Sequence, residues 1–283
     1  MPAGQTGAMT LPADGHVHSE WSWDARLGSM EGTCARAVER GLPAIAFTEH
    51  VDFTPFRAGA LVGSFGPLVH EGILTAPQLD VDGYLAGVER CRASFPDLRI
   101  LTGLEVGQPH RHPEQVAALL ARGPFDRVLG SLHCMPDGDA FAEPFTLFPD
   151  RPVEPAFRQL LTETARMVET SPHFTVLAHI DYPVRSWPAD AEPFDPINFE
   201  VELRRVLAAL AATERALEIN TKVPLHPTVL RWWREEGGRQ VTFGSDAHEP
   251  WRVGRGLAEA ADLASAHGFA AGRRPEDPWV LAR

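Results

Sequence analysis

The sequence is poor in the features that mark several large classes of protein. It has three cysteines in 283 residues, Cys34, Cys91 and Cys134, and they form no CxxC pair. A disulfide framework is therefore disfavoured, and a reducing cytoplasm is the simpler expectation. No apolar run approaches the roughly 18 residues of a membrane span. The N-terminus lacks the basic and apolar regions of a signal peptide.

Positive charge is also scarce. The chain has 26 Lys and Arg against 38 Asp and Glu, which gives a net charge of −12 with His neutral. An extended nucleic-acid surface needs a basic excess, so nucleic acid is disfavoured as a partner. The hydrophobic content of 44% and the charged content of 23% are ordinary for a globular protein.

Short apolar runs alternate with helix-like segments along the chain. The runs predict strands at residues 15–18, 44–48, 99–104, 127–131, 174–178, 216–220 and 240–244. Helices are predicted at residues 30–40, 81–94, 113–122, 154–169, 195–213, 226–236 and 256–267. This alternation indicates an α/β fold with a parallel sheet covered on both faces. No repeat, low-complexity tract or linker interrupts it, so a single domain is expected.

Three connections after predicted strands are long, at residues 51–79, 134–153 and 181–194, and they are rich in Pro, Gly and aromatics. Long loops at the C-terminal ends of parallel strands usually form the binding pocket. We therefore expect these loops to shape the substrate site.

Side chains suited to binding metal follow the predicted strands. They are His16, His18, His50, Glu105, His133, His179, Asp246 and His248. Residues i and i+2 of a strand point to the same side, so each close pair can reach one region. A lone histidine is more often just hydrogen-bonded, but ligands at successive strand ends converge only if the strands lie side by side. Imidazole and carboxylate together suit Zn, Mn or Fe.

These residues stand in motifs that resemble a known family. The motifs are DGHVHSEWSWD at 14–24, FTEH at 47–50, GLE at 103–105, GSLH at 130–133, AHID at 178–181, LEIN at 217–220 and FGSDAH at 243–248. Over roughly residues 14–269 the chain resembles the PHP (polymerase and histidinol phosphatase) superfamily, and within it the histidinol-phosphatase-like members. The resemblance implies a distorted (β/α)7 barrel over residues 14–270, with tails at 1–13 and 271–283.

The resemblance also implies two to three divalent metal ions (Zn, Mn or Fe) at the C-terminal ends of the strands. The first ion would be held by His16, His18, Glu105 and Asp246. Glu105 would bridge to a second ion held by His133 and His179, and a third would lie between Asp24, His50 and His248. Asp24 enters only through the resemblance, because an aspartate in a loop is usually a solvated turn residue.

The implied activity is hydrolysis of a small phosphomonoester by a hydroxide that bridges two metal ions. L-histidinol phosphate is the leading substrate, which would place the enzyme in histidine biosynthesis. Asp246, His248 and Arg185 are the predicted catalytic residues, and Arg185 and Lys222 are the candidates for binding phosphate. The competing interpretation of each cation is an ordinary surface charge. Asp181 could orient His179 as a carboxylate behind the metal site.

Three alternatives remain open at the level of sequence. The chain could act on another small phosphate or a phosphodiester, or its hydroxide could attack carbon in a C–N or C–O hydrolase. It could also be a metal-loaded binding or regulatory domain without turnover. The segment after Glu105, VGQPHRH, lacks the aromatic that many histidinol-phosphatase-like members carry there, so the metal site is better supported than the substrate.

Overall fold

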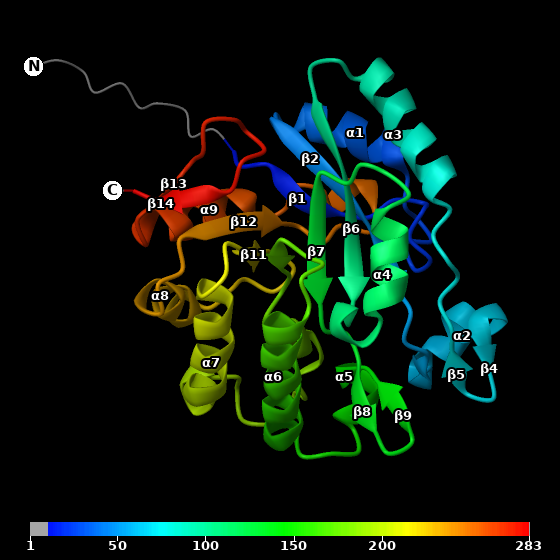
Figure 1. Cartoon of the computed structure of the whole chain (residues 1–283), viewed down its shortest axis with the longest axis vertical. Helices are drawn as coiled ribbons and strands as arrows, with labels where there is room; N and C mark the ends of the chain where they lie inside the picture. Colours follow the sequence, from blue (N-terminus) through cyan, green and yellow to red (C-terminus); the bar gives the residue numbers. More distant parts are fainter. Residues whose placement is uncertain (1–10, 283) are drawn as a thin grey trace, which may run out of the picture.

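A long curled sheet of parallel strands carries helices along its outside (Figure 1). The computed structural model describes residues 11–282, so most of the tail expected at residues 1–13 lies outside the described residues. The sheet has the strand order β1-β2-β6-β7-β10-β11-β12-β14-β13. Its parallel strands are β1 (Asp14–Val17), β2 (Ala44–Asp52), β6 (Arg99–Gly107), β7 (Arg127–Ser131), β10 (Val176–Leu177), β11 (Ala216–Asn220) and β12 (Gln240–Gly244).

The curl brings the first and last parallel strands together. The backbone N–H of His18 donates to the carbonyl oxygen of Ala247 at 2.8 Å, and that of Asp246 donates to His16 at 2.8 Å. The carboxylate of Asp14 accepts bonds from the N–H groups of Ser245 and Gly254 at 2.8 and 2.7 Å. The start of β1 is therefore fixed to the segment that follows β12.

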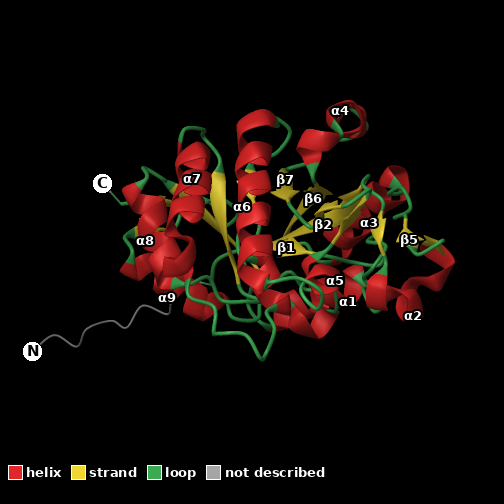
Figure 2. Ribbon diagram, turned by 90° about the horizontal axis from the view of Figure 1, so that it is seen from below, coloured by secondary structure: helices red, strands yellow, loops and turns green. Residues whose placement is uncertain are grey.

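Helices alternate with these strands as the sequence predicts. The longer ones are α1 (Met30–Glu39), α3 (Val81–Ser94), α4 (Pro113–Leu120), α6 (Val153–Thr170), α7 (Glu200–Ala211), α8 (Pro227–Glu235) and α9 (Leu257–Ala266). Helices α6 and α7 lie side by side on the outside of the sheet (Figure 2). Ser29 and Asp80 cap α1 and α3 by accepting bonds from Gly32 and Gly83. The predicted helix at 195–213 is divided into a 3-10 turn (Pro196–Phe199) and α7.

The predicted strands differ from the observed ones mainly at their ends. The strands expected at 127–131, 216–220 and 240–244 match β7, β11 and β12, whereas the strand expected at 174–178 is only the two residues of β10. Strands β2 and β6 run beyond their apolar stretches, so His50 and Glu105 lie inside strands. They are direct neighbours in the β2–β6 register. Ladder hydrogen bonds between the two strands therefore continue through polar residues that apolar patterning would exclude.

The two longest predicted loops form a second sheet with the order β4-β5-β3-β9-β8. We call it the small sheet. It comprises β3 (Phe56–Arg57), β4 (Val69–His70), β5 (Ile73–Leu74), β8 (Met135–Asp137) and β9 (Ala140–Ala142), with the short helices α2 (Val62–Phe65) and α5 (Pro144–Leu147). It has its own apolar cluster around Phe56, Leu74 and Cys134. In Figure 1 the arrowheads of β6 and β7 point toward its β8 and β9.

The end of the chain also takes part in the large sheet. Strand β13 (Phe269–Ala270) pairs antiparallel with β14 (Trp279–Leu281), and β14 pairs antiparallel with β12. The segment predicted as a tail at 271–283 therefore contains a paired strand. Within the described residues, no helix combines the length and apolarity needed to cross a membrane.

We predict that Asp14→Asn destabilises the fold, because an amide has one acceptor oxygen where the buried carboxylate uses two. The expected loss in the free energy of unfolding is about 1–3 kcal/mol, measured by denaturant unfolding. Asp97→Asn is the control, since Asp97 is exposed. Equal stability of the two variants would show that the hydrogen bonds of Asp14 to Ser245 and Gly254 do not contribute to the free energy of unfolding.

Candidate metal centre

A cavity of about 270 Å³ lies among the C-terminal ends of the parallel strands. Its walls include the predicted metal ligands Asp24, His50, Glu105, His133, His179, Asp246 and His248. The two remaining predicted ligands, His16 and His18, are fully buried beside it. All nine side chains that were predicted as ligands therefore lie in one region, although they come from segments far apart in the sequence.

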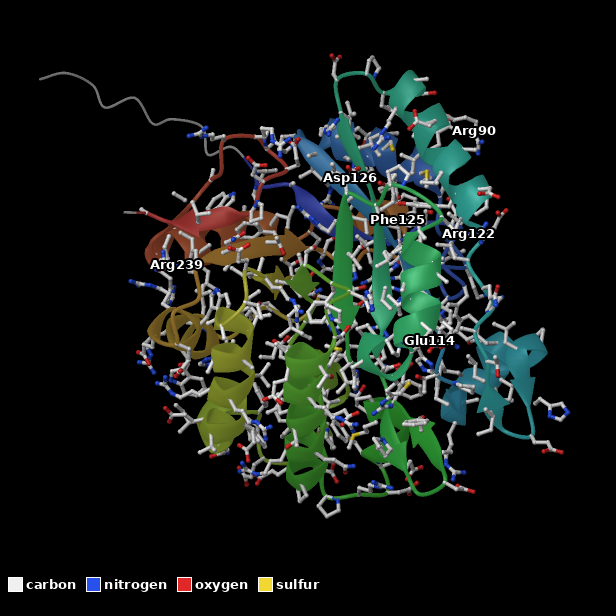
Figure 3. All side chains as sticks on the ribbon, viewed as in Figure 1. Arg90, Glu114, Arg122, Phe125, Asp126 and Arg239 are labelled. Carbon is white, nitrogen blue, oxygen red and sulfur yellow. The ribbon has the colours of Figure 1, made fainter. Side chains whose placement is uncertain are left out.

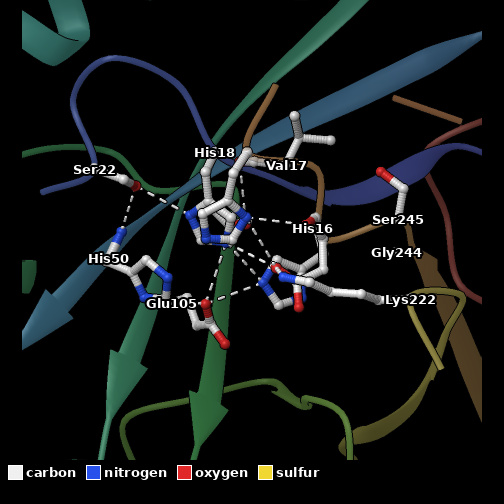
Figure 4. Close-up of polar contacts among 12 residues, drawn as sticks. His16, Val17, His18, Ser22, His50, Glu105, Lys222, Gly244 and Ser245 are labelled. Atoms are coloured by element: carbon white, nitrogen blue, oxygen red, sulfur yellow. Dashed lines mark hydrogen bonds and ion pairs between the residues drawn. The ribbon is translucent and has the colours of Figure 1, made fainter. Parts of the chain in front are cut away.

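Glu105 is the centre of this cluster (Figure 4). Its Oε2 atom lies 3.0 Å from His16 Nε2, 3.3 Å from His18 Nε2 and 3.2 Å from His50 Nδ1. Its other oxygen, Oε1, lies 2.7 Å from His179 Nε2 and 3.2 Å from His133 Nε2. One carboxylate thus faces five imidazoles, with each of its oxygens toward a different subset.

Two aspartates, Asp24 and Asp246, contact the histidines of the cluster as well. Asp24 Oδ2 lies 3.4 Å from His50 Nε2 and 3.1 Å from His248 Nε2. Asp246 Oδ1 lies 3.6 Å from His18 Nε2 and 3.4 Å from His248 Nδ1. Asp246 has a positive φ of 52°, which a non-glycine residue adopts at a cost. The chain accepts this cost where it turns the Asp246 carboxylate into the cluster.

The donor set fits divalent metal ions. Four overlapping groups have ligand atoms close enough to share an ion, namely His18 with His50 and His248, His16 with Glu105 and His179, His16 with His18 and Asp246, and His50 with Glu105 and His133. Within residues 11–282, Glu105 Oε2 and Asp24 Oδ1 are buried without a hydrogen-bond partner. Buried carboxylate oxygens need such a partner or a cation. The division of the ligands among three ions remains a prediction.

The electrostatics of the cluster favour bound cations. Burial by itself would raise the pKa of Glu105, but His16, His50 and His133 hold it well below its usual range. Burial lowers the pKa of His179 to about 4 despite the attraction of Glu105. Burial lowers the pKa values of His16 and His133 as well, but Glu105 outweighs it and raises both well above their usual range. Metal ions bound there would replace the protons of these rings.

Behind the ligands lie carboxylates to which sequence reasoning gave no role. Glu218 Oε1 is 2.7 Å from His16 Nδ1, and its Oε2 accepts the backbone N–H of His179 at 2.8 Å. Such partners fix the tautomer and orientation of ligating histidines. A Cβ at Gly244 would lie 2.2 Å from Glu218 Oε1 and 2.4 Å from His16 Cβ, so this contact requires glycine there. The available signal was a glutamate inside an otherwise apolar strand.

Two more carboxylates support the other histidines. Asp52 Oδ1 lies 3.3 Å from His133 Nδ1, and its Oδ2 accepts from Trp23. Glu49 accepts from Ser22, whose Oγ is 3.0 Å from His18 Nδ1. Asp181, which the sequence suggested as the carboxylate that orients His179, is buried, but within the described residues its side chain makes no hydrogen bond to that ring. Glu105 and Glu218 contact His179 instead.

The two predicted phosphate-binding cations lie at the cavity, in contact with the cluster. Arg185 Nη2 is 2.5 Å from Asp246 Oδ2, and Lys222 Nζ is 3.4 Å from Asp246 Oδ1. Lys222 is the only lysine in the chain. Both side chains line the cavity, Arg185 with 16% and Lys222 with 37% of its side chain exposed, and their role in binding phosphate stays a prediction.

A curled parallel sheet with clustered histidines and carboxylates at the C-terminal ends of its strands defines a metal-dependent hydrolase type of α/β protein. The PHP domain model matches residues 14–222, which is most of the chain. The chain belongs to the PHP domain family, as its motifs predicted.

The chain is similar to proteins that are named histidinol-phosphatases. The histidinol-phosphatase of Lactococcus lactis subsp. lactis (strain IL1403) is 27% identical over 90% of this chain and 91% of its own length. A Clostridium acetobutylicum protein named "Probable histidinol-phosphatase" is 26% identical over 89% of this chain and 92% of its own. The crystal structure of the Lactococcus lactis histidinol phosphate phosphatase, complexed with Zn, L-histidinol and phosphate, superposes with a TM-score of 0.78 and 26% identity. That likeness covers 94% of this chain and 98% of that one.

We predict that Glu218→Gln weakens metal binding by about 10–100-fold, because His16 loses the charged partner that orients it. Metal retained during titration with a chelator measures the effect. Glu214→Gln is the matched control, because Glu214 is exposed just before the same strand. Unchanged metal retention in Glu218→Gln would exclude the orienting role.

Proposed function

We propose that this chain is a metal-dependent phosphatase that hydrolyses L-histidinol phosphate to L-histidinol and phosphate. The observation that carries the proposal is the meeting of the histidine–carboxylate cluster with two cationic side chains at one cavity. The similar Lactococcus lactis protein has Zn, L-histidinol and phosphate bound together. A fold of this kind with a multi-ligand metal cluster fits hydrolysis of a phosphomonoester better than binding without turnover.

The proposed ligand sets follow the sequence prediction. One ion is assigned to His16, His18, Glu105 and Asp246, a second to Glu105, His133 and His179, and a third to Asp24, His50 and His248. Nitrogen and oxygen ligands of this kind suit Zn, Mn or Fe. When bound, such ions bring the pKa of water toward neutrality and offset charge on phosphoryl oxygens.

The chain's own cations are proposed to hold the phosphoryl group. The planar guanidinium of Arg185 can donate two parallel hydrogen bonds to phosphate oxygens. Its position is fixed from two sides, since it lies over the ring of Tyr182 at 5.0 Å and donates to Asn220 Oδ1 at 3.2 Å. Lys222 is more exposed, with 37% of its side chain accessible, and would act as a point charge at the same cavity. Both flank Asp246, so a phosphate that they hold lies beside the proposed first ion.

Three finer assignments belong to the same proposal. We assign the seven parallel strands to a distorted (β/α)7 barrel. The hydrogen bonds between the β1 segment and the segment after β12 support this assignment. The size of the cavity suits a small phosphorylated substrate rather than a polymer. A cytoplasmic location is consistent with the three cysteines, which are all free thiols.

We predict that the purified protein releases phosphate from L-histidinol phosphate and contains more than one equivalent of divalent metal. Chelation should abolish the release, and addition of Zn²⁺ or Mn²⁺ should restore it, because metal ions held by the cluster would activate the attacking water. Phosphate release and metal analysis provide the two measurements. A fully metallated protein that hydrolyses no phosphate ester would contradict the proposed function.

Arg185→Leu should lower kcat/KM for L-histidinol phosphate by about 10²–10³-fold, because a buried donor to the transition-state charge is lost. Arg90→Leu is the matched control. Arg90 is exposed on the outer helix α3 (Figure 3). Steady-state kinetics at equal metal content make the comparison, and equal activity of both variants would remove Arg185 from the site.

A further inference from the structure

The cavity contains a carboxylate that neither the metal cluster nor the phosphate-binding cations require. Glu143 follows β9 of the small sheet and reaches the same cavity as Arg185 and His133. It is 8% exposed. Its Oε2 accepts a hydrogen bond from Tyr182 at 2.5 Å, while Oε1 makes no hydrogen bond or ion pair with any residue in the described range 11–282. Glu143 therefore presents one free oxygen to the substrate cavity.

Tyr182 connects Glu143 to the metal centre without making it a ligand. The ring of Tyr182 packs against His133 at 5.2 Å and His179 at 5.1 Å between ring centroids. Its hydroxyl donates outward, to the carboxylate of Glu143. Glu143 is therefore held at a fixed position one aromatic ring beyond the proposed second ion. Glu143 and the predicted metal ligands line the same cavity, so an ester with its phosphoryl group among these ligands would place its alcohol part within the cavity that Glu143 lines.

A buried carboxylate without a paired cation is costly to keep, and a cationic ligand removes that cost. The fixed cations of the cavity, Arg185 and Lys222, are both occupied by Asp246. Asp52 also lines the cavity, but its two oxygens contact His133 and Trp23. The rest of the wall beyond the predicted metal ligands is apolar or aromatic, including Trp23, Phe65 and Phe145. Such a wall suits a ring but offers no positive charge to Glu143.

We propose that Glu143 is the specificity-determining residue that binds the ammonium group of the leaving alcohol, so that the site selects phosphate esters of amino alcohols with an aromatic side chain. The inference rests on the proposed function and deepens it. An alkyl amine is a full cation at neutral pH, with a lysine-like pKa of about 10.4, whereas an imidazole with a pKa of about 6.5 is mostly neutral. Glu143 therefore receives the amine, and the aromatic wall receives the ring.

The test compares two esters that differ only in the amine, L-phenylalaninol phosphate, which carries it, and 3-phenylpropyl phosphate, which lacks it. L-histidinol phosphate is assayed beside them as the proposed substrate. The wild-type protein and Glu143→Gln are assayed with metals bound. The amide oxygen of glutamine still accepts from Tyr182, so this change removes the charge and little else.

Glu143→Gln should lower kcat/KM for both amino esters by about 30-fold or more, mainly by raising KM, since a buried charged contact is lost. Hydrolysis of 3-phenylpropyl phosphate should change by less than about 3-fold. Glu143→Asp, which keeps the charge, should recover part of the preference for the amine. Glu192→Gln, at an exposed carboxylate, is the control and should match the wild type.

The outcomes separate this inference from the proposed function. If the wild-type protein hydrolyses L-histidinol phosphate and Glu143→Gln loses equally on esters with and without the amine, Glu143 has a structural or proton-donating role and the inference fails alone. An unchanged variant overturns it as well. If the wild type hydrolyses L-phenylalaninol phosphate with the expected Glu143 dependence but not L-histidinol phosphate, the amine assignment holds and the proposed function fails.

Discussion

The carboxylate of Glu105 is the point on which the arrangement of the site depends. It is buried, and it lies within 3.3 Å of five imidazole nitrogens that come from the ends of four strands, since His16 and His18 both belong to the β1 segment. Such a charge is stable inside a protein only when cations or donors surround it. The parallel sheet meets this condition because the carboxyl ends of its strands reach one edge. The register of β2 and β6 contributes to this arrangement, because it places His50 directly opposite Glu105.

The closure of the sheet places the remaining ligands. Asp14 joins the start of β1 to the segment after β12, and backbone bonds between His16 and Asp246 continue the connection. As a result, the first and last motifs of the chain contribute side chains to one cluster rather than to two edges of an open sheet. The positive φ of Asp246 is part of this closure, because it directs the carboxylate back toward His18.

The cavity combines two kinds of wall with different origins. The cluster of predicted metal ligands is built mainly on the strand ends of the large sheet. Glu143 and Phe65 come from the small sheet, which consists of strands of two or three residues. The large sheet thus positions the predicted metal ligands. The small sheet positions the side chains proposed to contact the alcohol part of the substrate. Substrate choice can change in such a protein without disturbance of the metal ligands.

The sequence by itself determined the alternation of strands and helices and most of the ligands. Apolar runs followed by histidine or carboxylate are local features, and β7, β11 and β12 begin and end where those runs do. Asp24 was reached only through family resemblance, since its loop carries no periodic signal. The tertiary structure decided the rest. The extension of β2 and β6 through polar residues, the β3–β9 pair that joins the two halves of the small sheet, and the contacts of Glu218 and Glu143 all depend on partners more than 30 residues away. No local pattern encodes such pairings, because the burial that makes a carboxylate functional exists only after the chain has folded.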